Sequence, residues 1–386
     1  MNQPMTPTAG AVLSPLHAEH VTLGATMTPF AGWLMPLRYA GDLAEHQAVR
    51  TAAGLFDLSH MGELHVDGPG AGTALDTALV GNLSALAVGR ARYTMIVAED
   101  GGILDDLIVY RLADQEFLVV ANASNVTVVR DALVERIAPF DATLTDRSLD
   151  TALVAVQGPR AAEILRGLVD PADVDAVLAV KYYAAVRGTV AGVDALVART
   201  GYTGEDGFEL FVPADAAPGL WRALLAAGEP AGLVPVGLSA RDSLRLEAGM
   251  PLYGNELDTT TNPQDAGLGR VVRLDKVTAD GTPLPFVGRA ALESRAHANP
   301  ARVLVGLIGL SRRATRHGYP VLTTTEADAA TIGRVTSGAP SPTLGVPIAM
   351  AYVTPEVSAV GTELAVDVRG RREPVRVVEL PFYRRS

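Results

Sequence analysis

The chain has 386 residues, of which 48% are hydrophobic and 19% charged, so it is long enough for two or three domains and too apolar to be disordered. Acidic residues outnumber Lys and Arg by 43 to 32, and this net charge of −11 argues against a nucleic-acid-binding surface. Because the chain has no cysteine, disulfides, thiolate nucleophiles, zinc–thiolate sites and cysteine-held clusters are excluded.

The amino-acid sequence predicts no membrane span and no targeting signal. No run of 18 apolar residues occurs, so we expect no membrane span and no membrane partner. The first twenty residues contain neither Lys nor Arg, unlike a secretory signal or a mitochondrial presequence. The sequence therefore predicts a cytoplasmic protein.

The first half of the chain contains a predicted antiparallel meander. Residues 93–98 and 103–112 are β-type runs separated by the turn composition of residues 99–102, and residues 117–121 supply a third strand.

Strands and helices then alternate. Residues 153–157 read as a buried strand, and residues 160–168 follow with helical apolar spacing. Residues 193–200 and 208–212 are strand patterns, and residues 218–227 read as a further helix. This mixture predicts an α+β fold rather than a doubly wound sheet.

Beyond a polar, Gly- and Pro-rich stretch at residues 280–285, the pattern changes. Short strands separated by turn residues replace the helices, which indicates a small all-β sandwich or barrel. The predicted strands are 302–310, 333–336, 349–353, 363–368 and 374–378.

Two adjacent carboxylates, Asp105 and Asp106, lie within the apolar strand at residues 103–112. Because successive side chains of a strand face opposite sides, the pair cannot share a proton, and Asp106 shares its face with Ile108 and Tyr110. One carboxylate either points to a place where its charge is useful or lies at a sheet edge.

A glycine-rich turn at residues 199–209 has GxxGxxG spacing, which differs from the GxGxxG of dinucleotide sites, and no phosphate-binding P-loop motif occurs anywhere. We therefore expect no nucleotide cofactor. Tyr202 and Glu209 can project from this turn toward a ligand, although the pattern taken alone favours a surface hairpin with solvated acids.

A predicted helix between Gly237 and Gly249 places Arg241 and Arg245 on one face, four residues apart. Ser239 is the expected N-cap. Two stacked arginines suit a planar or carboxylate-bearing anion, and the alternative is a solvated face with local ion pairs.

The histidines predict no metal site. His17 and His20 are three residues apart near the loose start of the chain. His60 and His65 are five residues apart, a separation that does not place both on one face of a helix or a strand. Ser59 beside His60 lacks the GxSxG elbow, so we expect no hydrolytic triad.

These clusters occur together with further segments, namely Phe30–Pro36, Gly54–Glu63, Val156–Pro159, Leu246–Gly254 and Ser337–Gly345. In this order, from about Leu16 to Tyr383, the chain resembles the glycine cleavage system T-protein family, the folate-dependent aminomethyltransferases. The resemblance implies transfer of a one-carbon unit from an aminomethyl-lipoyl carrier, the H protein, to tetrahydrofolate. The products would be 5,10-methylenetetrahydrofolate, ammonia and the dihydrolipoyl carrier.

The fold implied is a three-domain ring of the α+β class. Two interleaved ferredoxin-like α+β domains and a C-terminal β-barrel would surround a central folate channel. The corresponding boundaries are residues 1–280 for the folate-binding region, with one subdomain centred on 55–145, a linker at 281–300 and the barrel at 301–386.

The resemblance also implies site residues. Asp106 corresponds to the essential carboxylate beside the folate, and Glu209 to the pterin anchor. The remaining folate contacts would be Arg241, Tyr93, Tyr110, Asn122 and Tyr202, and tetrahydrofolate is expected as co-substrate with no metal.

The chain departs from the family pattern at Ala98, Ser239, Arg270 and Ala339-Pro340. Two alternatives share the fold: the folate module of demethylating oxidases, and a non-catalytic folate-binding protein of iron–sulfur assembly. The first carries a flavin domain with GxGxxG, and the second a Lys-Gly-Cys-Tyr segment, and this chain has neither.

Overall fold

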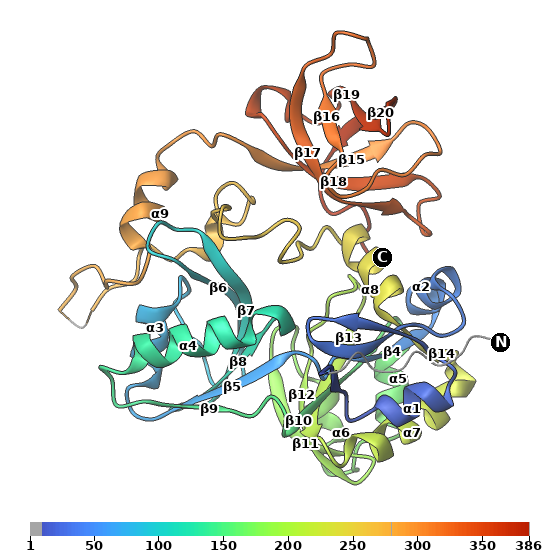
Figure 1. Ribbon diagram of the computed structural model, residues 1–386. Coiled ribbons are helices and arrows are strands. Elements are labelled where there is room, and N and C mark those ends of the chain that lie inside the picture. Colours follow the sequence, from blue (N-terminus) through green and yellow to red (C-terminus); the bar gives the residue numbers. More distant parts are fainter. Residues whose placement is uncertain (1–9, 279, 386) are drawn as a thin grey trace.

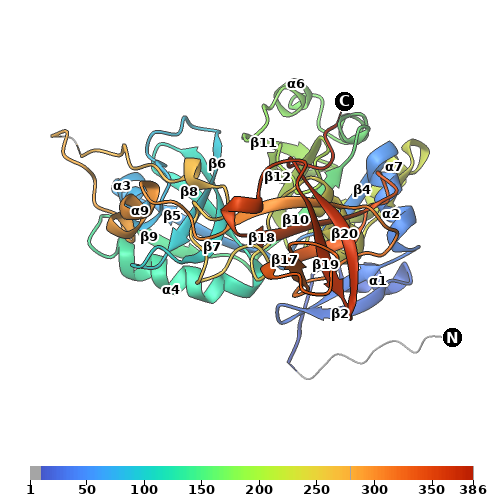
Figure 2. The same cartoon turned by 90° about the horizontal axis from the view of Figure 1, so that it is seen from above.

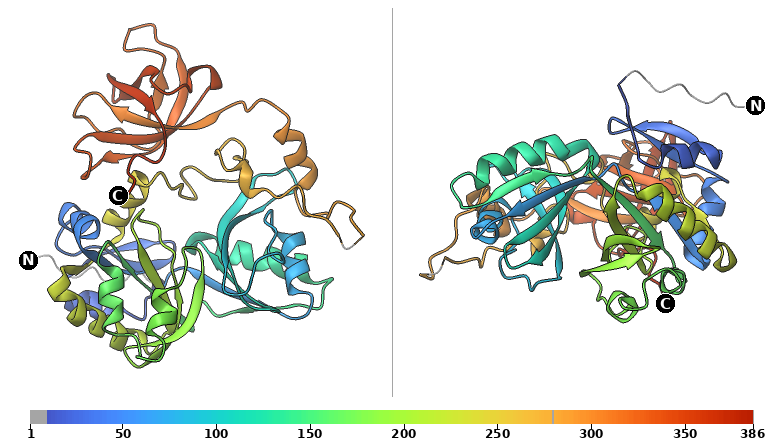
Figure 3. Two further views of the ribbon diagram at one scale, coloured as in Figure 1. Left: turned by 180° about the vertical axis from the view of Figure 1, so that it is seen from behind. Right: turned by 90° about the horizontal axis from the view of Figure 1, so that it is seen from below.

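The computed structural model describes residues 10–278 and 280–385, which form three bodies arranged around a common centre (Figure 1). Two bodies are α+β layers and the third is a β-barrel. Seen from above, the barrel lies in front of part of one of the two α+β bodies (Figure 2). The views from behind and from below show the two α+β bodies side by side (Figure 3).

The first body is built on a six-stranded sheet in which only the pairing of the last two strands is parallel. In sheet order its strands are β11 (Ala185–Val190), β12 (Val193–Ala198), β13 (Gly207–Pro213), β10 (Thr151–Gln157), β4 (Ala53–Asp57) and β14 (Leu233–Pro235). Its helices are α1 (His17–Thr22), α2 (Asp42–Thr51), α5 (Ala161–Arg166), α6 (Val174–Leu178), α7 (Ala217–Gly228), η2 (Glu229–Ala231) and α8 (Leu238–Glu247). A small sheet of β1 (Val12–Leu13), β3 (Trp33–Arg38) and β2 (Thr26–Phe30) adjoins it.

The second body is inserted in the chain between β4 and β10, so the two α+β bodies are interleaved. Its antiparallel sheet has the order β6 (Ala91–Val97), β7 (Ile103–Ala113), β8 (Glu116–Ala121), β5 (Gly62–Asp67) and β9 (Thr143–Asp146). The helical segments of this part are α3 (Ala71–Ala78), η1 (Ala123–Asn125) and α4 (Val126–Ile137), and the later η3 (Gly269–Val271) and α9 (Arg289–Ala296) pack beside β6.

The third body is a closed antiparallel barrel, since its last strand pairs with its first. The order is β15 (Val303–Gly309), β18 (Pro347–Val353), β17 (Thr331–Pro340), β16 (Pro320–Leu322), β19 (Glu363–Val368) and β20 (Arg371–Val378), with η4 (Pro355–Val357) after β18. The predicted α+β class with a C-terminal barrel is confirmed. The three-residue β16 escaped the sequence pattern because it is too short to show alternation.

The two large sheets face each other across a shared apolar layer. This layer includes Phe56, Leu118, Leu153 and Phe211, all buried, and Tyr110 at its edge. The opposite face of the first sheet is covered by helices around Trp221. Because both sheets are covered on two faces, the space between them is fixed by packing rather than by loops.

Residues 281–300, predicted as a linker, include α9, whose Leu292 is buried in one cluster with Val97 of β6 and Phe286. The domain boundaries themselves stay a prediction. Within residues 10–278 and 280–385, no helix combines the length and the apolar character that crossing a bilayer requires.

Candidate active site

A cavity of about 540 Å³ opens at one end of the layer between the two large sheets, and α8 and residues 250–255 close its far side. This volume lies within the range of small-molecule sites. All seven side chains that the sequence predicted line it: Tyr93, Asp106, Tyr110, Asn122, Tyr202, Glu209 and Arg241.

Asp106 faces the cavity from β7 and is held on both carboxylate oxygens. The Tyr93 hydroxyl donates to Oδ2 at 2.9 Å, and the Asn122 side-chain amide donates to Oδ1 at 2.8 Å. Burial raises the pKa of Asp106, and these two hydrogen bonds partly offset that rise. The arrangement fixes one carboxylate rotamer at the cavity wall.

Asp105 points the other way, as strand alternation requires, and is fully buried. It accepts from the Asn122 backbone N–H at 2.9 Å, from the Asn122 side chain at 2.9 Å and from the Asn125 side chain at 2.6 Å. Burial, followed by the charge of Asp106, raises the pKa of Asp105 to about 7, although these hydrogen bonds act to lower it. Asn122 therefore bridges the two carboxyl groups, and Asp105 anchors one of the two residues that hold Asp106.

Glu209 enters the same cavity from β13 of the other sheet. Its Oε2 accepts a short hydrogen bond from the Thr200 hydroxyl, which lies 2.9 Å from the Tyr110 hydroxyl. Burial raises the pKa of Glu209, whereas the Thr200 bond and the charge of Arg241 act in the opposite direction. Carboxylates from two different sheets thus converge on one space.

Arg241 lies on α8 with its guanidinium 4.9 Å from the centre of the Tyr202 ring. Burial lowers its pKa. Arg245 is turned away and fully buried, where it pairs with Glu256 at 2.9 Å and donates to Ser337 of the barrel at 2.8 Å. Only the first of the two stacked arginines reaches the cavity.

The sequence analysis missed several residues that line the cavity. His60 is buried, and burial followed by the charge of Arg241 lowers its pKa to about 4, so it is neutral near pH 7. Tyr183 adopts a left-handed backbone with φ of 56°, a conformation that no sequence pattern indicated. Phe30, Tyr253 and Asn255 complete this additional wall.

The start of α8 differs from the prediction, because its N-cap is Gly237 rather than Ser239. A Cβ on residue 237 would come within 2.3 Å of the Leu37 carbonyl oxygen, and the Gly237 N–H donates to Glu45 at 2.8 Å. Close backbone approach therefore decides where the helix begins. At the other end Gly249, with φ of 65°, ends the helix as predicted.

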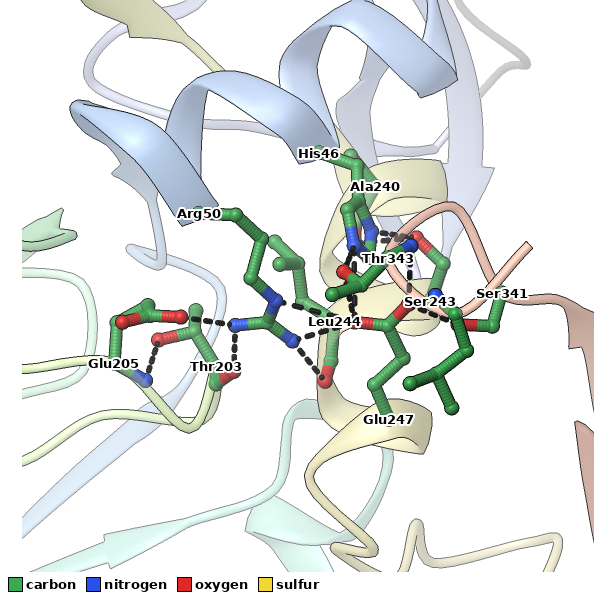
Figure 4. Close-up of polar contacts among 11 residues, drawn as sticks. His46, Arg50, Thr203, Glu205, Ala240, Ser243, Leu244, Glu247, Ser341 and Thr343 are labelled. Carbon is green, nitrogen blue, oxygen red and sulfur yellow. Dashed lines mark hydrogen bonds and ion pairs between the residues drawn. The ribbon is translucent and has the colours of Figure 1, made fainter. Parts of the chain in front are cut away.

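The C-terminal end of α8 is tied to α2 and to the barrel by a buried polar network (Figure 4). Glu247 accepts from His46 at 3.0 Å, from Arg50 at 2.9 Å and from Ser341 of the barrel at 2.5 Å. Arg50 also pairs with Glu205 at 2.8 Å. The helix that carries Arg241 is thereby fixed to α2 of its own body and to the barrel.

The four departures from the family pattern lie outside the cavity lining: Ala98 after β6, Ser239 in the first turn of α8, Arg270 exposed in η3, and Ala339-Pro340 at the end of β17. Within the described part of the chain, no three His, Cys, Asp or Glu side chains are grouped to hold a metal ion.

A cavity of this size with aromatic walls and a fixed carboxylate is typical of an enzyme that acts on a small molecule. The family profile described as GCVT N-terminal domain matches residues 16–276, and the Glycine cleavage T-protein C-terminal barrel domain matches residues 302–384. The chain therefore belongs to the glycine cleavage T-protein family, and the predicted aminomethyltransferase function is confirmed.

Relatives of nearly equal length agree. The aminomethyltransferase of Streptomyces coelicolor is 62% identical over 375 residues, 96% of this chain and 97% of the relative, and that of Streptomyces avermitilis is 63% identical over 376 residues with the same coverage. The crystal structure of glycine cleavage system aminomethyltransferase T from Bartonella henselae matches with a TM-score of 0.86 at 36% identity, covering 96% of this chain and 98% of that one.

Proposed function

We propose that the cavity binds tetrahydrofolate and that the chain transfers to it the one-carbon unit carried as an aminomethyl group on a lipoylated carrier, the H protein. One observation carries this proposal: Asp106 and Glu209 project from opposite sheets into a single cavity of about 540 Å³ with aromatic walls. In the overall reaction the carbon–sulfur and carbon–nitrogen bonds of the donor break, ammonia and the carrier thiol leave, and two folate nitrogens bind the carbon.

Asp106 is proposed as the catalytic carboxylate. As the donor's carbon–nitrogen bond breaks, positive charge develops on the transferred carbon, and a carboxylate already fixed by Tyr93 and Asn122 stabilises that charge without reorganising. The same carboxylate orients the accepting nitrogens. Asp105 keeps Asn122 in place and acts only through it.

Glu209 is proposed as the pterin anchor. The pterin edge presents a ring N–H and an exocyclic amino group side by side, which fits a bidentate carboxylate. Tetrahydrofolate, when bound, supplies the nitrogen nucleophiles that receive the carbon. Thr200 and Tyr110 hold Glu209 in the orientation that this contact needs.

Arg241 and the aromatic side chains would position the rest of the ligand. Arg241 offers planar N–H donors in a buried setting, where they suit a carbonyl or carboxylate of the ligand. Tyr93, Tyr110 and Tyr202 provide flat walls for the rings. A cytoplasmic location, predicted from the sequence, remains part of this proposal.

The experiment mixes the purified chain with tetrahydrofolate and carrier loaded with the aminomethyl group, and measures ammonia and methylenetetrahydrofolate together. We expect both products in equal amounts, only when carrier and folate are present. Folate binding without ammonia release would refute the transfer activity, and ammonia release without folate would refute the proposed acceptor.

A further inference from the structure

A second recess contains a carboxyl group that the proposed reaction does not use. Glu63 on β5 is fully buried, and neither of its carboxyl oxygens has a hydrogen-bond partner among the described residues. Its backbone is satisfied, because the N–H donates to Ser148 at 3.0 Å and the carbonyl accepts from the Arg147 N–H at 2.9 Å. Only the side chain lacks a partner, which is unusual for a buried acid.

Glu63 lies at the wall of a groove of about 730 Å³ that shares no lining residue with the active-site cavity. The groove occupies the other end of the layer between the two sheets. On β8, Leu118 faces the groove and Val120 faces the active-site cavity. On β13, Phe211 faces the groove and Glu209 faces the active-site cavity. Packed side chains of the shared apolar layer therefore separate the two spaces.

The groove combines an apolar wall with an excess of acids. Leu112, Leu196 and Phe211 form part of the wall. Four carboxyl groups line the groove against two arginines and one histidine. Arg187 is engaged by Glu116 outside the groove at 2.9 Å, which leaves less positive charge to balance the acids. Such a surface favours a ligand with an apolar body and a cationic end.

We propose that this groove is a second binding site, for a small planar ligand whose apolar ring carries an amidine- or guanidine-type pair of N–H donors that binds the Glu63 carboxylate. Both oxygens are buried in the free protein, so the Glu63 carboxyl group turns into the groove when the ligand binds. Two parallel N–H donors then satisfy both oxygens at once. The site is independent of the folate cavity and of the reaction proposed for it.

Binding of such a cation is coupled to proton release. Burial, followed by the charge of Asp146, raises the pKa of Glu63 well above its usual range, which favours the protonated side chain in the free protein. The titratable and charged groups around it are His65, Asp146, Arg147, Asp150, Arg187 and Asp194. Asp173 also lines the groove, and its carboxylate accepts a hydrogen bond from the Thr189 N–H at 2.8 Å. When a cationic amidine forms the ion pair, the Glu63 proton passes to the buffer.

Benzamidine is the probe for the test, because it consists of a phenyl ring and an amidinium group. Its binding to the full chain is measured by titration calorimetry at pH 7 in two buffers of different ionisation enthalpy, with and without saturating 5-formyltetrahydrofolate. We expect binding that is unaffected by the folate and that releases protons, at most one per ligand bound.

Two variants and a control locate the site. Glu63→Gln should bind benzamidine at least tenfold more weakly and release no proton, whereas Glu135→Gln, an exposed acid on α4, should match the wild type. A double variant, Asp150→Asn with Asp194→Asn, changes exposed acids only, so folding is preserved, and it should weaken binding about fivefold at low salt.

Several results would overturn the proposal. These are no heat of binding at millimolar benzamidine, displacement of benzamidine by the folate, or equal affinity and proton release in wild type and Glu63→Gln. Loss of transfer activity plays no part in these outcomes, so a failure of the proposed function remains distinguishable from a failure of the second site.

Discussion

Replacing Asp106 with asparagine removes the charge of this side chain and keeps its shape. An asparagine amide oxygen can accept from Asn122, and its NH₂ group can donate to a Tyr93 hydroxyl that rotates, so both present partners stay satisfied. One unit charge about 4 Å from a developing positive charge is worth about 4 kcal/mol at an effective dielectric constant of about 20. We therefore expect kcat to fall by about a thousandfold.

The assay follows ammonia and methylenetetrahydrofolate under saturating carrier and folate, with folate affinity measured separately by calorimetry. The folate Kd should change by less than about threefold, because Glu209, the proposed pterin anchor, is untouched. Since Asp106 must be ionised, wild-type kcat should fall as pH decreases through its raised pKa, and the residual activity of the variant should lose this acid limb. A kcat within tenfold of wild type, or loss of folate binding, would refute the assigned role.

Three further substitutions test neighbouring parts of the site. Asp105→Asn keeps one acceptor oxygen, and its NH₂ group then faces either the Asn122 backbone N–H or the Asn122 and Asn125 side-chain amides. We therefore expect about 1–3 kcal/mol lower unfolding free energy in urea with folate contacts retained. Glu209→Gln should weaken folate binding about 10–100-fold while kcat at saturation is kept, and an equal loss of kcat would count against a pure anchor. Glu247→Gln should lower the unfolding free energy by about 3–5 kcal/mol, because it breaks a buried charge network. In the wild type, His46 and the other partners of Glu247 outweigh burial and lower its pKa to about 2. The unfolding free energy of the wild type should therefore fall as the pH decreases from about 5 to about 2. Calorimetry checks both effects.

Strands and helices could be predicted from the sequence where the spacing of apolar residues and the turn residues between them indicated the same structure. The Gly-rich turn at residues 99–102 indicated the β6–β7 hairpin, and strand alternation correctly separated Asp105 from Asp106. All seven predicted side chains line one cavity, and that set rested on the family resemblance. The roles of these side chains stay predictions until the substitutions are made.

The remaining features depend on contacts between distant segments. Gly237 begins α8 because Glu45, 192 residues earlier, accepts its N–H and the Leu37 carbonyl leaves no room for a Cβ. The left-handed backbone of Tyr183 has no local signature either. Sequence spacing cannot report such constraints, since they arise only once the sheets have packed.

The two ends of α8 give the barrel an indirect part in the site. Arg241 faces the cavity from the second turn of the helix, whereas Glu247 at the last turn is held by His46, Arg50 and Ser341. Because Glu247 and Arg241 lie on one short helix, we expect a change that loosens the barrel from Glu247 to displace Arg241 relative to Glu209 as well. The buried polar network would thus preserve the spacing of two side chains that we propose bind the ligand, a role consistent with a buried carboxylate outside the cavity lining.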